Sequence, residues 1–303
     1  MKNLVFLLMA AVLSSCSDDD DSNSVINNPQ TPGLAYSVSE SDFTTTYNTL
    51  RAEIQSISNI SIIAEVNHTA NAQSINQELR NTRVIFFGNP ALGTPLMQEN
   101  QLAGLDLPQK MLVYEDKNKN VFVSYNGTEY LAARHSGVGG ASTLQQIKMA
   151  LANFAEDATN ASVAENSSTG ITNKDGIITI VSNNDFNTTY TNLRNAIVDN
   201  TNLTRVAELD HQANAQTVDL DLNPTRIILF GNPELGTPLM KKSQTTAIDL
   251  PQKMLVWEKE DGTVNISYND PDFFQERHGI NGNEDTLQQI KSALNNLAID
   301  AAN

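Results

Sequence analysis

Residues 82–115 read TRVIFFGNPALGTPLMQENQLAGLDLPQKMLVYE, and residues 225–258 read TRIILFGNPELGTPLMKKSQTTAIDLPQKMLVWE. The two stretches are identical at 23 of 34 positions and align without a gap at an offset of 143. Similarity at one fixed offset indicates an internal repeat. The chain is therefore predicted to hold two copies of one folding unit, so that each element expected in one copy has a counterpart in the other.

The overall composition fits two folded units. The 303 residues suffice for two domains of ordinary size, and an apolar fraction of 40% is enough for two packed cores. Lys and Arg number 19 against 35 Asp and Glu, which gives a formal net charge of −16. A nucleic-acid backbone needs a basic patch, and the basic residues here are few and dispersed. The composition therefore argues against DNA or RNA as a partner, and the acidity alone identifies no other.

Residues 1–16 are typical of a cleaved export signal. Lys2 supplies the positive end, and residues 4–13 form an apolar run that is too short to span a bilayer as a helix. The run ends on Leu-Ser-Ser-Cys, which resembles the lipobox of bacterial lipoproteins, with cleavage before Cys16 and lipid on its thiol. An ordinary secretory signal is the alternative. Because Cys16 is the only cysteine, neither a disulfide nor a free thiol is expected in the lipidated protein.

Four consecutive aspartates, residues 18–21, follow this cysteine closely. An acidic tract at this place resembles the surface-export signal of Bacteroidetes lipoproteins, and the alternative is a solvated spacer that its like charges extend. Residues 17–33 are rich in Ser, Asn, Asp and Pro, so we predict an unstructured tether. We therefore expect an outer-membrane lipoprotein, anchored to the membrane through lipid on Cys16 and, on the first interpretation, exposed at the cell surface.

Each copy is predicted to be one α+β unit. Copy one is expected at residues 34–158 and copy two at residues 176–303, with a polar linker at residues 159–175. The apolar periodicity predicts the order strand, helix, four strands, helix in each copy. Short turns between consecutive strands indicate an antiparallel sheet with helices on one side. Two such units can pack about a pseudo-two-fold axis, and whether they share one sheet stays open.

Two local predictions concern element boundaries. A strand at residues 60–68 is expected to end on His68, whose side chain would prolong the apolar face of that strand. The Gly-Asn-Pro segment at residues 88–90 is expected to end the next strand, because proline lacks an N–H donor. A short helix should then begin, with Thr94 as its N-cap and Pro95 as its first residue.

Several segments carry a family resemblance. FGNPALGTPLM and LDLPQKMLVYE in copy one, DHQANA at residues 210–215, and the Arg277-His278 pair resemble the domain of unknown function 302 family, over nearly the whole of both copies. The resemblance implies an α+β fold similar to that of TATA-binding protein, and it carries no settled biochemical activity. Copy one departs from the motif at Asn67, where copy two has Asp210. Copy two is therefore the better candidate for a site that needs this carboxylate.

The candidate ligand-binding residues are polar side chains that recur between the copies. They are His68, Asp106, Lys110, His135, His211, Asp249, Lys253, Arg277 and His278. The two strand-end histidines either make hydrogen bonds at the edge of the core or contact a ligand. The Arg-His pairs either bind an anion or pair with one of the two aspartates. Each lysine is a Schiff-base nucleophile, a charge at the edge of a strand or the partner of a carboxylate.

Complete catalytic and metal-binding motifs are absent from the sequence. It has no cysteine pair, no His-Glu-x-x-His, no Gly-x-Ser-x-Gly and no phosphate-binding loop. We therefore expect no metal and no cofactor. The leading hypothesis is a non-enzymatic envelope module that binds a small molecule or another envelope protein. The alternatives are a purely structural envelope protein and a hydrolase-like or isomerase-like enzyme that uses His211, Asp249, Lys253 and His278.

Overall fold

The computed structural model describes residues 26–303, so the predicted export signal, Cys16 and the acidic tract at residues 18–21 lie outside the described residues. Copy one contains, in chain order, β1 (Leu34–Ser39), α1 (Phe43–Ser56), β2 (Ser61–Asn67), α2 (His68–Ser74), β3 (Thr82–Gly88), α3 (Pro90–Glu99), the 3-10 helix η1 (Gln101–Leu105), β4 (Gln109–Glu115), β5 (Val121–Asn126), α4 (Thr128–Arg134), the 3-10 helix η2 (Val138–Gly140) and α5 (Leu144–Thr159). A two-residue strand, β6 (Ala164–Glu165), follows.

Copy two repeats most of these elements. It contains β7 (Ile177–Val181), α6 (Phe186–Val198), β8 (Thr204–Asp210), α7 (His211–Gln216), β9 (Thr225–Gly231), α8 (Pro233–Lys242), the 3-10 helix η3 (Gln244–Ile248), β10 (Gln252–Glu258), β11 (Val264–Asn269), α9 (Pro271–His278) and α10 (Glu284–Ala302). The fold is therefore α+β with two tandem units, as predicted. Within residues 26–303, each helix is too short or too polar to cross a membrane.

Each copy forms its own antiparallel sheet. The first has the strand order β2-β3-β4-β5-β1-β6, and the second has the order β7-β11-β10-β9-β8. The two copies thus do not share one sheet. The segment between them, which we interpreted as a linker, also contributes structure, because β6 pairs with β1 and extends the first sheet by one strand.

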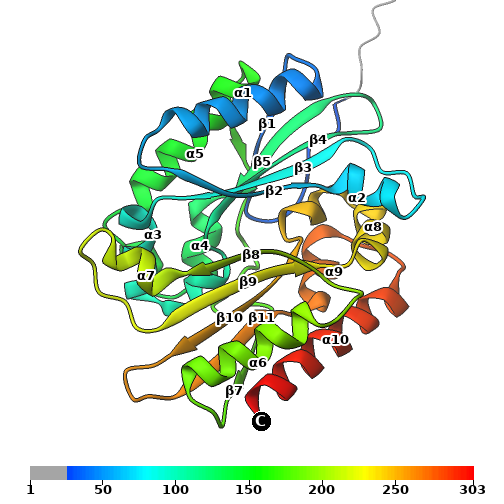
Figure 1. The fold of residues 1–303 in the computed structure, drawn as a ribbon. Coiled ribbons are helices and arrows are strands. Elements are labelled where there is room, and N and C mark those ends of the chain that lie inside the picture. The colour runs from blue at the N-terminus through cyan, green and yellow to red at the C-terminus, as the bar shows by residue number, and fades with distance from the viewer. Residues whose placement is uncertain (1–25) are drawn as a thin grey trace, which may run out of the picture.

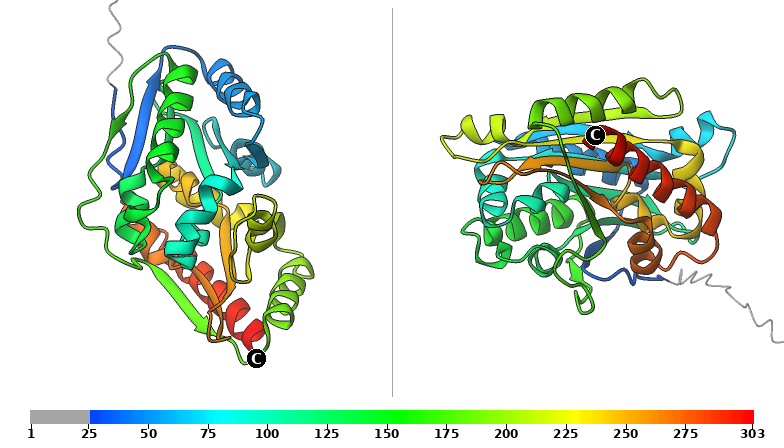
Figure 2. Two further views of the ribbon diagram at one scale, coloured as in Figure 1. Left: turned by 90° about the vertical axis from the view of Figure 1, so that its left-hand side faces the viewer. Right: turned by 90° about the horizontal axis from the view of Figure 1, so that it is seen from below.

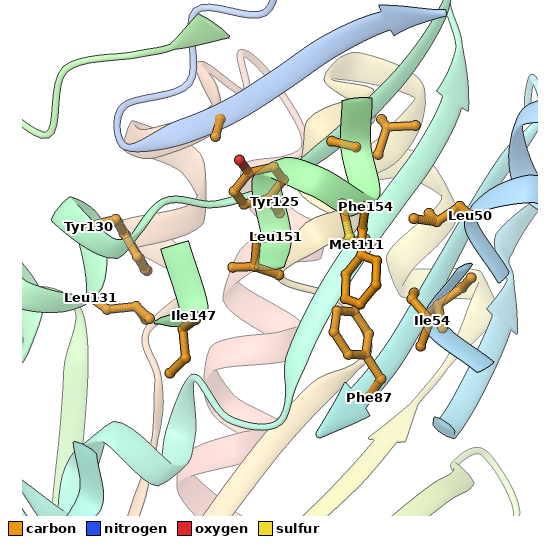
Figure 3. Close-up of a cluster of buried hydrophobic side chains, with 14 of the residues drawn as sticks. Leu50, Ile54, Phe87, Met111, Tyr125, Tyr130, Leu131, Ile147, Leu151 and Phe154 are labelled. Carbon is orange, nitrogen blue, oxygen red and sulfur yellow. The ribbon is translucent and has the colours of Figure 1, made fainter. Parts of the chain in front are cut away.

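Helices cover one face of each sheet, as predicted. Helices α1 and α5 cover the first sheet, and α6 and α10 cover the second, on opposite sides of the molecule (Figure 1). Helix α1 shows why: Asp42 caps its start, and one stripe of its surface is buried, namely Phe43, Tyr47, Leu50 and Ile54. Figure 3 shows α1 and α5 side chains meeting side chains of the first sheet in this outer core.

The opposite faces of the two sheets turn toward each other and share one apolar cluster. In the left view of Figure 2 the first copy lies above the second along one broad boundary. Each copy contributes a 3-10 helix to this boundary: η1 packs against β9, β10 and β11, and η3 packs against β3, β4 and β5. Gln101 of η1 donates to Thr225 of copy two at 2.7 Å, and Gln244 of η3 donates to Thr82 of copy one at 2.8 Å. The contacts across the boundary are therefore reciprocal.

The predicted end of the strand at residues 88–90 is confirmed, since β3 ends at Gly88, but the predicted helix start and the predicted strand end at His68 are wrong. Helix α3 begins at Pro90 rather than Pro95, because the side chain of Asn89 accepts from the Ala91 N–H at 3.0 Å and caps the helix one turn earlier. His68 begins helix α2 instead of prolonging β2, because Asn67 caps that helix in the same way. A proline at the first helical position is a correct indication of a helix start here, but the proline at that position is Pro90 and not Pro95.

Candidate functional site

The first candidate site is a buried ion cluster where the two copies meet. Asp106 lies at the end of η1, and its Oδ2 accepts a hydrogen bond from Nη1 of Arg134 at 2.8 Å. The same oxygen lies 2.8 Å from Nε2 of His135. Arginine thus pairs with the aspartate, which is one of the two alternatives that the sequence left open.

Copy two repeats this arrangement at the end of η3. Oδ2 of Asp249 accepts from Nη1 of Arg277 at 2.7 Å and lies 2.9 Å from Nε2 of His278. Each arginine also reaches across the boundary to the other copy. Nη2 of Arg134 donates to Oδ1 of Asn269 at 2.8 Å, and Nη2 of Arg277 donates to Oδ1 of Asn126 at 2.7 Å. The guanidinium groups therefore link the two copies directly.

Lys110 and Lys253, each the second residue of its strand, complete the cluster from β4 and β10. Nζ of Lys110 lies 3.5 Å from Oδ1 of Asp249 in the other copy and 3.9 Å from Oδ1 of Asp106 in its own. Nζ of Lys253 lies 3.9 Å from Oδ1 of Asp106. At most 2% of these side chains is exposed. Both lysines thus share carboxylates across the boundary between the copies.

Burial and neighbouring charges shift the pKa values of these groups. Burial alone would raise the pKa of Asp106, but the charge of Arg134 and the hydrogen bond from His135 hold it well below its usual value. The same balance, with Arg277 and His278 as partners, lowers the pKa of Asp249. Burial, together with the neighbouring Lys110, lowers the pKa of Lys253 well below its usual value. The positively charged partners therefore outweigh burial at both carboxylates, whereas burial dominates at Lys253.

The second candidate is a pair of apolar pockets, which sequence reasoning missed. One has a volume of about 210 Å³ and lies against α3 and α5, and the other has a volume of about 120 Å³ and lies against α8 and α10. Each pocket is lined by 21 residues, and every residue of one has its counterpart 143 positions away in the other. The two pockets are therefore one site repeated by the duplication.

Each pocket takes part of its lining from the opposite copy. Leu209, His211 and Asn214 of copy two line the pocket of copy one. Their counterparts Val66, His68 and Asn71 line the pocket of copy two in return. The exchange arises because α7 packs on α3 and α2 packs on α8. Neither pocket is complete without the other copy.

The exchanged histidines are buried and neutral. Burial lowers the pKa of His68 to about 4, against an opposing backbone hydrogen bond with Leu250. Burial also lowers the pKa of His211 to about 4, although the charge of Asp210 opposes it. Among the described residues, neither Nε2 atom has a hydrogen-bond partner. No Asp, Glu, Lys or Arg lines either pocket, so both pockets are uncharged at neutral pH.

The structure thus divides the predicted candidates into two groups. Asp106, Lys110, His135, Asp249, Lys253, Arg277 and His278 meet in the ion cluster. His68 and His211 line the pockets instead. The proposed enzymatic set is therefore split, because His211 lies in a pocket while Asp249 and His278 are in contact elsewhere. Within residues 26–303, no group of three or more His, Cys, Asp or Glu side chains is arranged to hold a metal ion.

A signal for the pockets was present in the repeated stretch. Residues 88–97 and 231–240 differ at one position, yet they include partly exposed polar residues such as Asn89 and Asn232 that line the pockets. Gln109 and its counterpart Gln252 line them as well. The near-identity of the copies in these segments is visible in the sequence, but residue types alone do not distinguish the lining of a pocket from a folding signature.

Similar proteins were found by sequence and by structure. A stretch of 72 residues, 24% of this chain, is 43% identical to the fluoride-specific ion channel FluC 1 of Brucella suis and to that of Brucella abortus. It spans only 28% and 27% of those channels. A crystal structure of an uncharacterized conserved protein DUF302 from Bacillus stearothermophilus aligns with 42% of this chain and 95% of its own, at 17% identity and a TM-score of 0.34.

The family itself follows from the match to both copies. The model of the family described as domain of unknown function DUF302 matches residues 35–154 and again residues 178–297. These two segments cover most of the chain and coincide with the two α+β units described above. The chain therefore belongs to the DUF302 family and carries two copies of its domain in tandem.

Proposed function

We propose that this protein is an envelope lipoprotein that binds small, uncharged, mainly apolar molecules in its two pockets and catalyses no reaction on them. The observation that carries the proposal is the exchange between the copies. The two pockets carry the same residue at 16 of the 21 paired positions, including the histidine and the asparagine that the opposite copy supplies. A void left by imperfect packing in one copy would not need to be lined by the same residues in the other copy.

The chemistry of the lining supports an uncharged ligand. Apolar walls with a few polar groups are typical of small-molecule sites. A charged ligand would lose its hydration without gaining a counter-ion, because the lining holds no charged side chain and its histidine stays neutral. The imidazole of His211 and the carboxamide of Gln109 supply neutral polar groups in the pocket of copy one. These groups suit a ligand with a single hydroxyl or amide group.

The ion cluster supports a binding protein rather than an enzyme. Asp249, His278 and Lys253 are the residues that a hydrolytic or isomerising mechanism would need, and they are almost fully buried between the copies. Their hydrogen bonds and ion pairs run to one another and to partners in copy one. Such a cluster positions the two copies, and thereby the two pockets, against each other.

The envelope location rests on the sequence before the described residues. The apolar run, the lipobox ending at Cys16 and the four aspartates that follow favour export and lipid attachment. The end of the segment predicted as an unstructured tether is instead part of the folded body, because Nδ2 of Asn166 donates to the carbonyl oxygens of Pro29 and Thr31, and Nε of Arg277 donates to that of Pro32. A module of this kind would sample small molecules at the outer membrane.

The test compares ligand binding by the wild-type chain with binding by a variant whose two pockets are filled. Ala150 lines the first pocket from α5, and its counterpart Ala293 lines the second from α10. A panel of small uncharged molecules is screened by methyl NMR against the wild type and against Ala150→Trp/Ala293→Trp. We expect several members of the panel to bind the wild type and none to bind the filled variant.

The matched control places the same substitutions on the same helices outside the pockets. Gln146 on α5 and Gln289 on α10 are exposed counterparts that line neither pocket. Gln146→Trp/Gln289→Trp should bind the panel as the wild type does. Binding that persists in the filled variant, or a panel of which no member binds the wild type, would refute the proposal.

A further inference from the structure

We infer that the two pockets have diverged, so that the pocket of copy one accepts a single uncharged aromatic ring and that of copy two accepts only smaller aliphatic molecules. The inference rests on the proposed binding function and adds the class of ligand. It starts from the two volumes, about 210 Å³ in copy one and about 120 Å³ in copy two. An apolar cavity of about 150 Å³ holds benzene, so the two pockets lie on either side of this size.

The side chains that differ between the pockets concern aromatic character rather than size, because Phe154, Ile63 and Leu209 of the larger pocket stand against the smaller Leu297, Val206 and Val66 of the other. Of the 21 paired positions, 16 carry the same residue and five do not. The largest change of chemistry is Phe154 in copy one against Leu297 in copy two. A smaller change is Ser61 against Thr204, which adds a methyl group to the smaller pocket. Copy one thus has a second aromatic ring where copy two has an aliphatic side chain.

The two rings of the first pocket already form a favourable aromatic pair. Phe87 and Phe154 lie with ring centroids 5.8 Å apart and an interplanar angle of 85°, an edge-to-face arrangement. Figure 3 shows the rings of Phe87 and Phe154 meeting beside Ile54, with Leu151 and Ile147 farther along α5. Both rings, Leu151 and Ile147 line the pocket. A third ring can therefore extend an existing aromatic arrangement, and the second pocket offers only Phe230 for this contact.

The specificity-determining residue on this basis is Phe154, and benzene is the probe. Ile147 lines the first pocket and its counterpart Ile290 lines the second, so their methyl resonances report each pocket separately. In a benzene titration of the full chain we expect a saturating shift of Ile147 and none of Ile290. With 2-propanol, a small aliphatic probe, Ile290 should shift.

Substitutions then test whether the ring of Phe154 is responsible for benzene binding. Phe154→Leu should weaken benzene binding about fivefold, the loss expected for one aromatic contact. Ala150→Trp, which fills the first pocket, should abolish the Ile147 response, and its counterpart Ala293→Trp should leave that response unchanged. Unchanged benzene affinity in Phe154→Leu would refute the role of this ring.

The outcomes separate this inference from the binding function. Equal benzene affinities at Ile147 and Ile290 would overturn the divergence of the pockets and leave two functional binding sites. If neither benzene, 2-propanol nor any other molecule of the panel shifts either residue, the binding function fails, and the divergence fails with it.

Discussion

Asp249 shows how much depends on single carboxylates at the boundary. Its Oδ2 accepts from Arg277, and its Oδ1 lies 3.5 Å from Lys110 of the other copy, with 1% of the side chain exposed. Breaking one partner of a buried ion pair leaves an uncompensated charge, which costs more than the pair gains. Asp249 therefore stabilises the packing of the two copies against each other.

Asp249→Asn should lower the free energy of unfolding by about 3–5 kcal/mol, because it leaves Arg277 buried without its counter-charge. Urea denaturation followed by circular dichroism measures the change. The exposed pair of Asp272 with Lys291 provides the control, and Asp272→Asn should cost below about 1 kcal/mol. A loss at Asp249 no larger than in the control would contradict the role of the cluster.

The two pocket histidines predict how stability depends on pH. Their ordinary pKa of 6.5 falls to about 4 in the folded protein, mainly through burial. Between these values the unfolded chain binds the proton and the folded chain does not, so the free energy of unfolding decreases as the pH falls from about 6.5 to 4. The decrease should reach about 3 kcal/mol for each histidine and should be absent above pH 7.

His68→Gln/His211→Gln removes these two titrations, so its stability should change less than that of the wild type between pH 6.5 and 4. Thermal or urea unfolding at a series of pH values gives the comparison. Parallel curves for the wild type and the variant would show that the histidines are not buried as described.

At the scale of the element, helix caps explain a difference between the copies. Asp210 caps α7 by accepting from the Ala213 N–H at 2.9 Å, and Asn67 caps α2 by accepting from the Ala70 N–H at 3.0 Å. Asn and Asp are equally good at this position. The departure of copy one at Asn67 therefore preserves the helix and the histidine that begins it.

Asp210→Asn should cost below about 1 kcal/mol, because it keeps the cap and loses only the partly exposed ion pair with Arg226. Asp210→Ala should cost about 1–2 kcal/mol, since it also loses the cap. Chemical denaturation of both variants provides the measurement. An asparagine variant as unstable as the alanine variant would mean that the carboxylate itself is needed.

Regular elements were the most predictable part of the fold. The stripe of Phe43, Tyr47, Leu50, Ile54 and Ile57 predicted α1, and the repeated pattern predicted the central strands. Ile57 was the one wrong member, because it is the exposed C-cap that follows the helix. Helices α2 and α7 were not predicted, because each has at most seven residues and follows a strand without a break. The start of α3 was misplaced because two prolines, Pro90 and Pro95, compete for the first turn.

At the scale of the whole molecule, the constant offset of 143 residues between the repeats predicted two units. It did not predict that each unit supplies residues to the pocket of the other. The same repeated pattern fits copies that pack apart and copies that complete each other's sites. Pairing of arginine with Asp106 and Asp249 could be named as an alternative from residue types. The reach of Arg134 and Arg277 into the other copy could not, because sequence separation carries no information about the boundary.

The proposed lipoprotein assignment predicts lipid on Cys16. If Cys16 is acylated, radiolabelled palmitate should be incorporated into the wild type and not into Cys16→Ser. Growth with label, followed by gel electrophoresis and autoradiography, gives the result. Label in both proteins, or in neither, would contradict the lipoprotein interpretation and leave the folded body unaffected.

The reciprocal construction of the pockets is tested most directly by methyl NMR of two single variants. His211→Ala in copy two should shift the methyl resonances of Met97 and Ile147 in copy one, and His68→Ala should shift those of Met240 and Ile290 in copy two. This crossed pattern is the predicted result. Shifts confined to the copy that carries the substitution would contradict it, since each histidine would then belong to its own copy's pocket.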